Sequence, residues 1–470
     1  MKSRYLSVIL SLILCNNFLY GQNSQDTIHY TIEKPHVRPW VAFGEVILIN
    51  YVVNRVNTLR PDGDFAHVNW DSWKRNIERG FEWDWNNFGT NWISHPYHGG
   101  TYFNAARSLG MNFWESSPYA ATGSLIWEFL GETHPASAND FICTTLGGMF
   151  LGESFHRITE NILDDRTTGI NRVWREGVTL FLDPLKFFNR ALTGRLTRRT
   201  TYLTHNRSHT DAWLYAVGSG IFSSLKEGES SFFALRLDLD YGNKFYNFNT
   251  SYIPFEFFDF GASMRFARTY LESNLPYLNV HGTGNLYGKQ YGKKNIIGAS
   301  LAYEFINNEI AEIGSFSIPI YYQKRLDFNE KNHLDLDINL GPMFGSSNTE
   351  LIDSLDIDPE DPEILRNYSF SSGARLNAAA ELRINTYRFW ASYWFWKMLV
   401  ISGPSGHENV QGLQSNFEKR ISDRWSIGVG YIYYRRHSLY DNFDDVLFST
   451  HQFNLFAGYK FSKKNIDPYY

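Results

Sequence analysis

The feature that most constrains this chain is a strict alternation of apolar and polar residues, which recurs from about residue 210 to the C-terminus. In the run 233–241, every second side chain is apolar, and Arg236, Asp238 and Asp240 stand between them. The same period of two returns in the runs 258–266, 297–305, 334–340, 425–433 and 453–461. A period of two predicts β-strands with one apolar and one polar face.

Twelve such strands are predicted, and each is about long enough to cross a bilayer at a tilt. The predicted strands are 211–221, 231–241, 256–267, 277–287, 295–306, 314–324, 333–344, 369–382, 386–398, 409–420, 424–435 and 449–461. Pro319 falls inside the sixth strand, where it removes one ladder hydrogen bond. The predicted fold class is an α+β membrane protein: an N-terminal α-helical domain followed by an antiparallel transmembrane β-barrel of about 12 strands.

Connection lengths support a barrel entered from the periplasm. Long polar connections at 345–368, 399–408 and 436–448 fall where outer loops are expected, and tight turns at 383–385 and 421–423 fall on the inner side. The stretch 242–255 is long for an inner turn. The even strand count still returns the C-terminus to the periplasm.

Composition agrees with a barrel and leaves one alternative open. Hydrophobic residues make up 43% and aromatic residues 17% of the 470 residues, while the mean hydropathy is only −0.36. A barrel combines these values because lipid-facing residues alternate with polar lumen residues and aromatic rings collect at both interfaces. A large soluble β protein is the alternative that composition alone permits.

The first residues predict export. Lys2 and Arg4 precede a short apolar stretch at 5–14, and Gly21 offers a small residue for cleavage, as in a secretory signal peptide. The predicted domains are a signal peptide (1–21), a helical plug or periplasmic domain (22–209) and an outer-membrane barrel (210–470). Lipidation at Cys15 is an alternative that the large Leu14 disfavours. Removal of the signal peptide leaves Cys143 alone, so no intramolecular disulfide is expected.

The N-terminal part has the texture of packed helices. A helix is predicted over 39–60, a packed irregular segment over 65–95, and further helices start at Ser117-Pro118, at Ser137 and at Asp183-Pro184. Ser137 and Asp140 resemble a capping box that opens a helix to about residue 164. Gly148 and Gly152 have the spacing that permits close helix contact.

A stretch of this helical part resembles uncharacterised outer-membrane proteins of Gram-negative bacteria that carry a domain of unknown function. The residues that carry the resemblance are His95-Pro96-Tyr97-His98-Gly99-Gly100, Asn104-Ala105-Ala106-Arg107, Trp114-Glu115-Ser116-Ser117-Pro118, Trp127-Glu128, Gly131-Glu132, the segment 140–153, Asp183-Pro184 and Asn189-Arg190. The resemblance covers about 110 residues and implies an exported, barrel-associated protein. It implies no reaction.

Polar residues of the helical part form the candidate site. This polar cluster consists of His95, His98, Arg107, Glu128, Glu132, Glu153 and His156. We expect these side chains to serve mainly in buried hydrogen bonds and ion pairs, with Arg107 as an anchor for Glu128 or Glu132. The alternative is one zinc or iron ion held by His95, His98, Glu153 and His156, because imidazole and carboxylate suit these metals.

These observations favour a non-enzymatic outer-membrane protein that serves envelope structure, assembly or passage of a small solute. Two alternatives stay open: a lipid- or envelope-active metal-dependent enzyme that uses the His/Glu cluster, and an accessory subunit of an outer-membrane complex. The expected partners are outer-membrane lipid and other outer-membrane proteins, and no basic cluster indicates nucleic acid. No cofactor is expected beyond the single metal ion. The expected location is the outer membrane, with the helical domain on the periplasmic side or inside the barrel.

Charged residues on the predicted lumen face carry both signs. They are Arg236, Asp238, Asp240, Asp259, Arg265, Asp335, Asp337, Arg375, Glu381 and Arg383. Mixed signs favour internal ion-pair networks over a selective ion pore, which tends toward one sign at its constriction.

Overall fold

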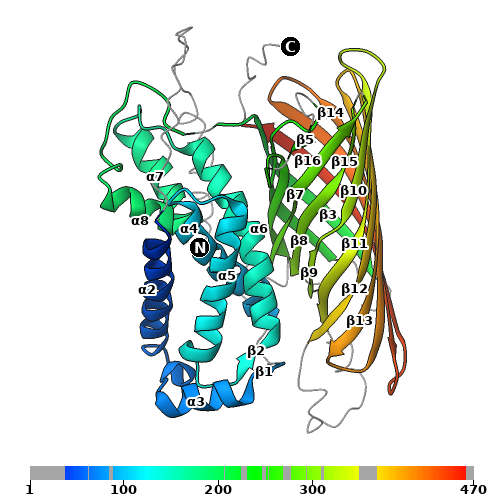
Figure 1. Ribbon diagram of the computed structural model, residues 1–470. Coiled ribbons are helices and arrows are strands. Elements are labelled where there is room, and N and C mark those ends of the chain that lie inside the picture. Colours follow the sequence, from blue (N-terminus) through cyan, green and yellow to red (C-terminus); the bar gives the residue numbers. More distant parts are fainter. Residues whose placement is uncertain are drawn as a thin grey trace.

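The computed structural model describes residues 38–61, 63–83, 88–205, 207–223, 230–245, 250–251, 253–267, 277–292, 294–307, 312–348 and 368–461. The predicted signal peptide lies outside these residues. In the described part, helices of the N-terminal half stand beside a closed antiparallel barrel (Figure 1).

The barrel wall contains twelve strand positions. Its strands are β3 (Thr210–Ser223), β4 (Ser230–Tyr241), β6 (Phe258–Ala267), β7 (Tyr277–Tyr291), β8 (Asn295–Asn307), β9 (Glu312–Ser317), β10 (Ile320–Asp327), β11 (His333–Asn348), β12 (Tyr368–Ile384), β13 (Tyr387–Ser402), β14 (Gly406–Arg420), β15 (Trp425–Tyr440) and β16 (Val446–Lys460). β9 and β10 share one position, because both pair with β8 and β11. β16 pairs with β3, which closes the barrel. A two-residue strand, β5 (Thr250–Ser251), pairs with β7.

The predicted barrel is therefore confirmed, with small differences at strand ends and at one proline. Pro319 divides the sixth strand into β9 and β10, since proline has no backbone N–H to donate. β13 and β14 pair as far as Leu399 with His407, so most of the predicted outer loop 399–408 is strand. β15 and β16 likewise shorten the predicted loop 436–448. Most of the predicted loop 345–368 lies outside the described residues.

The helical domain contains seven α-helices in its described residues. They are α2 (Pro39–Asn57), α3 (Trp70–Arg79), α4 (His95–Arg107), α5 (Phe113–Ile126), α6 (Ala138–Ile162), α7 (Ile170–Leu182) and α8 (Pro184–Leu192). Shorter elements are η2 (Gly63–Ala66), the π-helical turns η3 (Thr90–Ser94) and η4 (Trp127–Gly131), and a parallel pair of two-residue strands, β1 (Phe81–Glu82) and β2 (Ala136–Ser137). No helix in the described residues combines the length and the apolar character needed to cross a membrane.

Two predictions about the helices are wrong. In its described residues the segment 65–95 is largely helical, because Asn69 and Ser72 cap each other reciprocally and start α3. The helix predicted from Ser117-Pro118 begins earlier, at Phe113, where Asn112 and Glu115 form a capping box. A stronger start signal upstream therefore decides where this helix begins.

The centre of the helical domain is the contact between α4 and α6. A Cβ atom on Gly148 would lie 2.4 Å from the backbone carbon of Gly99, and one on Gly152 would lie 2.7 Å from the ring of Phe103. The close helix contact predicted from Gly148 and Gly152 is thus present, and Gly99 on α4 is its partner.

The barrel interior is held together by its own charged side chains. Glu304 of β8 accepts a hydrogen bond from Arg375 of β12 at 3.0 Å, although these strands are not neighbours. Such a contact runs through the interior, so Glu304 faces the lumen and its neighbours Tyr303 and Phe305 face outward. Further ion pairs join Arg388 to Glu381 and Glu418.

The helical domain packs on the outer wall of the barrel. Trp92 stacks on Phe316 of β9 with ring centroids 4.7 Å apart, and the Tyr303 hydroxyl of β8 donates to the Trp92 carbonyl. Phe150 of α6 lies 5.6 Å from the ring of Tyr303. The helical domain is therefore not a plug, since the outward face of the strands contacts it and the lumen side chains pair with one another. Its side of the membrane stays a prediction.

Candidate functional site

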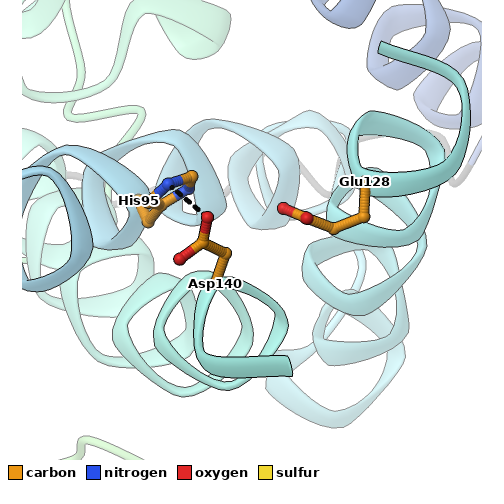
Figure 2. Close-up of side chains that lie close together, drawn as sticks. All are labelled: His95, Glu128 and Asp140. Carbon is orange, nitrogen blue, oxygen red and sulfur yellow. Dashed lines mark ion pairs between the residues drawn. The ribbon is translucent and has the colours of Figure 1, made fainter. Parts of the chain in front are cut away.

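Three buried side chains from three elements converge in the helical domain. His95 begins α4, Glu128 lies in η4, and Asp140 lies in the first turn of α6. Figure 2 shows their head groups turned toward one another. One donor atom from each lies within 4.8 Å of the others, and His95 Nε2 is 3.1 Å from Asp140 Oδ2. The three side chains are 7%, 2% and 1% exposed, respectively.

The local sequence places these groups by unusual turns and one shared cap. A π-helical turn precedes His95 and another contains Glu128. Such turns are rare in proteins, and those that occur often lie at functional sites. Ser137 Oγ accepts a hydrogen bond from the Asp140 amide and starts α6 as predicted. In a complete capping box the Ser137 amide would donate to the Asp140 side chain. Here it donates to Glu128 Oε2 instead, at 2.8 Å. This hydrogen bond connects η4 to the start of α6.

Glu153 forms a separate, fully buried ion-pair centre. Arg107 donates to Glu153 Oε2 at 2.7 Å and to Oε1 at 3.2 Å, and Arg157 donates to Oε1 at 2.7 Å. Burial raises the pKa of Glu153, but Arg107 and Arg157 outweigh it, and the net pKa is lowered. The prediction that Arg107 anchors Glu128 or Glu132 is wrong, because α4 and α6 place it on Glu153.

The predicted four-residue metal set is wrong as well. Glu153 is held by the two arginines, and His156 faces Asp183, with 3.8 Å between Nδ1 and Oδ2. Burial lowers the pKa of His156, and so do the nearby charges of Lys186 and Arg107. Of the four predicted ligands, His95 alone belongs to the cluster with Glu128 and Asp140.

His98 and Glu132 lie at the edge of this cluster. Burial, with a smaller effect of His95, lowers the pKa of His98 to about 4, so the ring is neutral at pH 7. Glu132 Oε1 accepts a hydrogen bond from the Trp127 indole. Burial, with Glu128 and then Glu132, raises the pKa of Tyr102, whose hydroxyl donates to Asn50 at 3.0 Å.

The sequence reasoning missed two groups of residues. The sequence predicts Asp140 only as part of a helix cap, yet its carboxylate also contacts His95. A second buried network joins Arg190 to Asp165 at 2.6 Å and to Glu176 at 2.7 Å. The Asn189-Arg190 pair of the resemblance was the one signal for this network.

The helical domain matches a known protein family. Residues 80–185 match the family described as "Domain of unknown function (DUF3943)", and the match includes His95, Glu128 and Asp140. The predicted resemblance is confirmed. Nothing among the curated proteins matches this chain.

Similar solved structures include a porin, an outer membrane protein and the β domain of an autotransporter. The KdgM porin in complex with disordered oligogalacturonate is 8% identical, with 52% of this chain and 98% of that chain covered and a TM-score of 0.26. A loop deletion mutant of OmpT, an outer membrane protein of Vibrio cholerae, is 10% identical over 54% and 100% of the chains, with a TM-score of 0.22. The β domain of the Bordetella autotransporter BrkA is 11% identical over 54% and 99%, with a TM-score of 0.28. This chain joins a closed antiparallel β-barrel to a helical domain, and much of that domain matches a domain of unknown function.

Proposed function

We propose that this protein has a non-enzymatic role in the structure of the outer membrane. The barrel acts as a support, and the helical domain lies beside it at the level of the lipid and enlarges the lipid-facing surface. One observation carries the proposal: α2 exposes a largely apolar outer face, on which Arg55 is the charged residue, and buries Asn50 and Asn54 on its inner face.

The pattern of α2 is the reverse of a water-facing helix. Its outer face carries Trp40, Ile47, Leu48, Tyr51 and Val52, which are 85%, 46%, 59%, 62% and 48% exposed. A helix on the surface of a water-soluble domain presents charged and polar residues there instead. An exposed apolar face of this extent indicates contact with an apolar partner.

Two asparagines of α2, Asn50 and Asn54, point inward and are hydrogen-bonded. The Asn54 amide donates to the carbonyls of Ala66 and Gly131, each at 2.9 Å, and the Asn50 amide donates to the Val46 carbonyl at 3.0 Å. Such internal pairing is what lipid demands, because a bilayer offers no hydrogen-bond partner to an exposed amide.

The barrel wall also carries an apolar outer surface. Ile320, Ile338 and Leu340 on β10 and β11 point outward and are more than half exposed, as expected of side chains that contact lipid. α6 packs against β8 and β9 of the barrel wall. At about 1.5 Å per residue, its 25 residues span about 37 Å, which exceeds a hydrocarbon core of about 30 Å. Lipid at this flank would therefore meet the helical domain in place of the barrel wall.

Lipid contact can be tested with single labels in vesicles. A fluorescent label is attached to one introduced cysteine at a time. Leu48→Cys places the label on α2, and Leu455→Cys places it on the exposed outer face of β16. Lys331→Cys places it on an exposed polar turn. The described cysteine, Cys143, is buried and reacts poorly by comparison. The proposal predicts that brominated lipid tails quench the Leu48 and Leu455 labels alike, whereas iodide in the buffer quenches the Lys331 label.

The contrary result is equally specific. If iodide quenches the Leu48 label as strongly as the Lys331 label, while brominated lipid quenches the Leu455 label alone, then α2 faces water and the proposed lipid-level role is wrong. Other barrels that co-purify in stoichiometric amount and protect Leu48 from both quenchers would favour the accessory-subunit alternative.

A further inference from the structure

We propose that His95, Glu128 and Asp140 form a binding site for one divalent metal ion of the zinc, manganese or iron(II) class. The proposal goes beyond the envelope role, and its test does not depend on whether α2 contacts lipid.

The geometry is close to that of ligands around a single ion. Metal–nitrogen and metal–oxygen distances of about 2.0–2.2 Å place neighbouring ligand atoms roughly 3.0–3.5 Å apart. His95 Nε2 and Asp140 Oδ2 already have this separation, at 3.1 Å. The longer separations, which reach at most 4.8 Å, are those to Glu128. A shift of the Glu128 carboxylate by about 1 Å would bring all three ligand atoms to the spacing expected around one ion.

Each ligand is also held from behind through an atom on its other side. His95 Nδ1 lies 3.3 Å from Thr144 Oγ1, Glu128 Oε2 accepts from the Ser137 amide at 2.8 Å, and Asp140 Oδ1 accepts from Asn139 Nδ2 at 3.0 Å. Outer contacts of this kind orient metal ligands and fix the histidine tautomer. An ion on Nε2 requires the proton on Nδ1, where Thr144 Oγ1 is placed to accept it.

The donor set selects the class of ion. One imidazole and two carboxylates are borderline and hard ligands, which suit zinc, manganese and iron(II) better than soft ions such as copper(I). A divalent cation also carries the charge that matches two ionised carboxylates. Three protein ligands leave at least one coordination position for water or another small ligand.

A second His/carboxylate group in the described residues has a different environment. His333, Asp335 and Glu381 come together in the barrel lumen, where Arg325 binds Asp335 at 2.6 Å and Arg388 binds Glu381 at 2.6 Å. Guanidinium groups therefore already balance these two carboxylates, so the proposal is confined to the helical domain.

The test is the metal content of the full chain, purified from outer membranes in detergent and also after chelation and reloading with zinc, manganese or iron(II). The variants His95→Gln, Glu128→Gln and Asp140→Asn remove one ligand each with little change in shape. The matched control is His156→Gln, a buried histidine beside a carboxylate in the same domain. We expect about one ion per chain in the wild type and in His156→Gln, and at least a tenfold lower content in the three ligand variants.

Two results would overturn the proposal: a reloaded wild type with less than a tenth of an ion per chain, or a Glu128→Gln variant that keeps the wild-type content. Folding is checked by the heat-dependent gel mobility of the barrel and by circular dichroism of the helices. Should the variants misfold, X-ray absorption of the zinc-loaded wild type decides. A shell of nitrogen and oxygen donors with one imidazole supports the site, and a shell without imidazole contradicts it.

Discussion

At the scale of single residues, the largest expected effect belongs to Glu153. Its carboxylate is fully buried between Arg107 and Arg157, whose side chains are 19% and 13% exposed. Removing one partner of a buried ion pair leaves the others uncompensated and costs about 3–5 kcal/mol. We therefore expect Glu153→Ala to lower the unfolding free energy of the helical domain by about that amount, measured by hydrogen exchange of the α6 amides.

The control for Glu153 is an exposed ion pair on α3. Glu78 lies 3.7 Å from Lys74, with both side chains more than 60% exposed. Such surface pairs contribute about 0–1 kcal/mol. A Glu78→Ala variant as damaging as Glu153→Ala would show that burial does not decide the effect.

Glu45 on α2 gives a prediction for pH. Burial raises its pKa to about 7 from 4.5, with a smaller opposing effect of a hydrogen bond from Asn189. A carboxyl group with a raised folded-state pKa favours folding while it is protonated, and this contribution is lost as the pH rises from about 4.5 through about 7.

We accordingly expect Glu45→Gln to gain stability relative to the wild type at pH 8 and to gain little at pH 4.5. Thermal unfolding of both proteins across this range measures the difference. A gain that is the same at both pH values would contradict the assigned pKa.

At the scale of elements, the α4–α6 contact should not tolerate a larger side chain. A Cβ atom on Gly148 would lie within 2.4–2.7 Å of Gly99, so Gly148→Val must push the two helices apart. We expect a loss of at least about 3 kcal/mol, beyond the usual 1–3 kcal/mol for overpacking, because the clash is with backbone. Denaturant unfolding followed by tryptophan fluorescence measures this loss.

The matched control is Gly177 on α7, which has nothing within 4 Å of its Cβ position. Gly177→Ala should stabilise the chain by up to about 1 kcal/mol through helix propensity alone. Equal and small effects at both glycines would mean that α4 and α6 are not in contact.

Much of the fold could be predicted from the sequence, because the strand signal recurs along the whole barrel, in runs such as 233–241 and 453–461. The helices of the bundle were harder. α4 contains Gly99 and Gly100, which have low helix propensity and are needed for the approach to α6. The sequence indicates His95 and Glu128 as single candidates, but it indicates neither Asp140 nor the pairing of the three side chains. The sequence places Glu153 and His156 on one helix face, while tertiary packing decides that Arg107 reaches Glu153 and that His95 reaches Asp140.

At the scale of the whole molecule, the two parts share a large aromatic interface. Phe88, Trp92 and Phe150 of the helical part pack on Phe305, Phe316 and Tyr303 of the barrel wall, respectively. Aromatic pairs contribute about 0.5–1.5 kcal/mol each beyond the area they bury. Sequence alternation could predict that these barrel residues face outward. It could not predict that protein, in place of lipid, covers them.

The central claim is that the helical domain lies on the outer wall of the barrel, and photo-crosslinking from that wall tests it most directly. A photoreactive phenylalanine replaces Phe316, which stacks on Trp92, or Ile338, which is 51% exposed on the neighbouring outer face of β11. Irradiation in membranes is followed by mass spectrometry. We predict that position 316 joins the peptide containing Trp92 and that position 338 joins lipid alone. Crosslinks from both positions to lipid alone would contradict the docked arrangement.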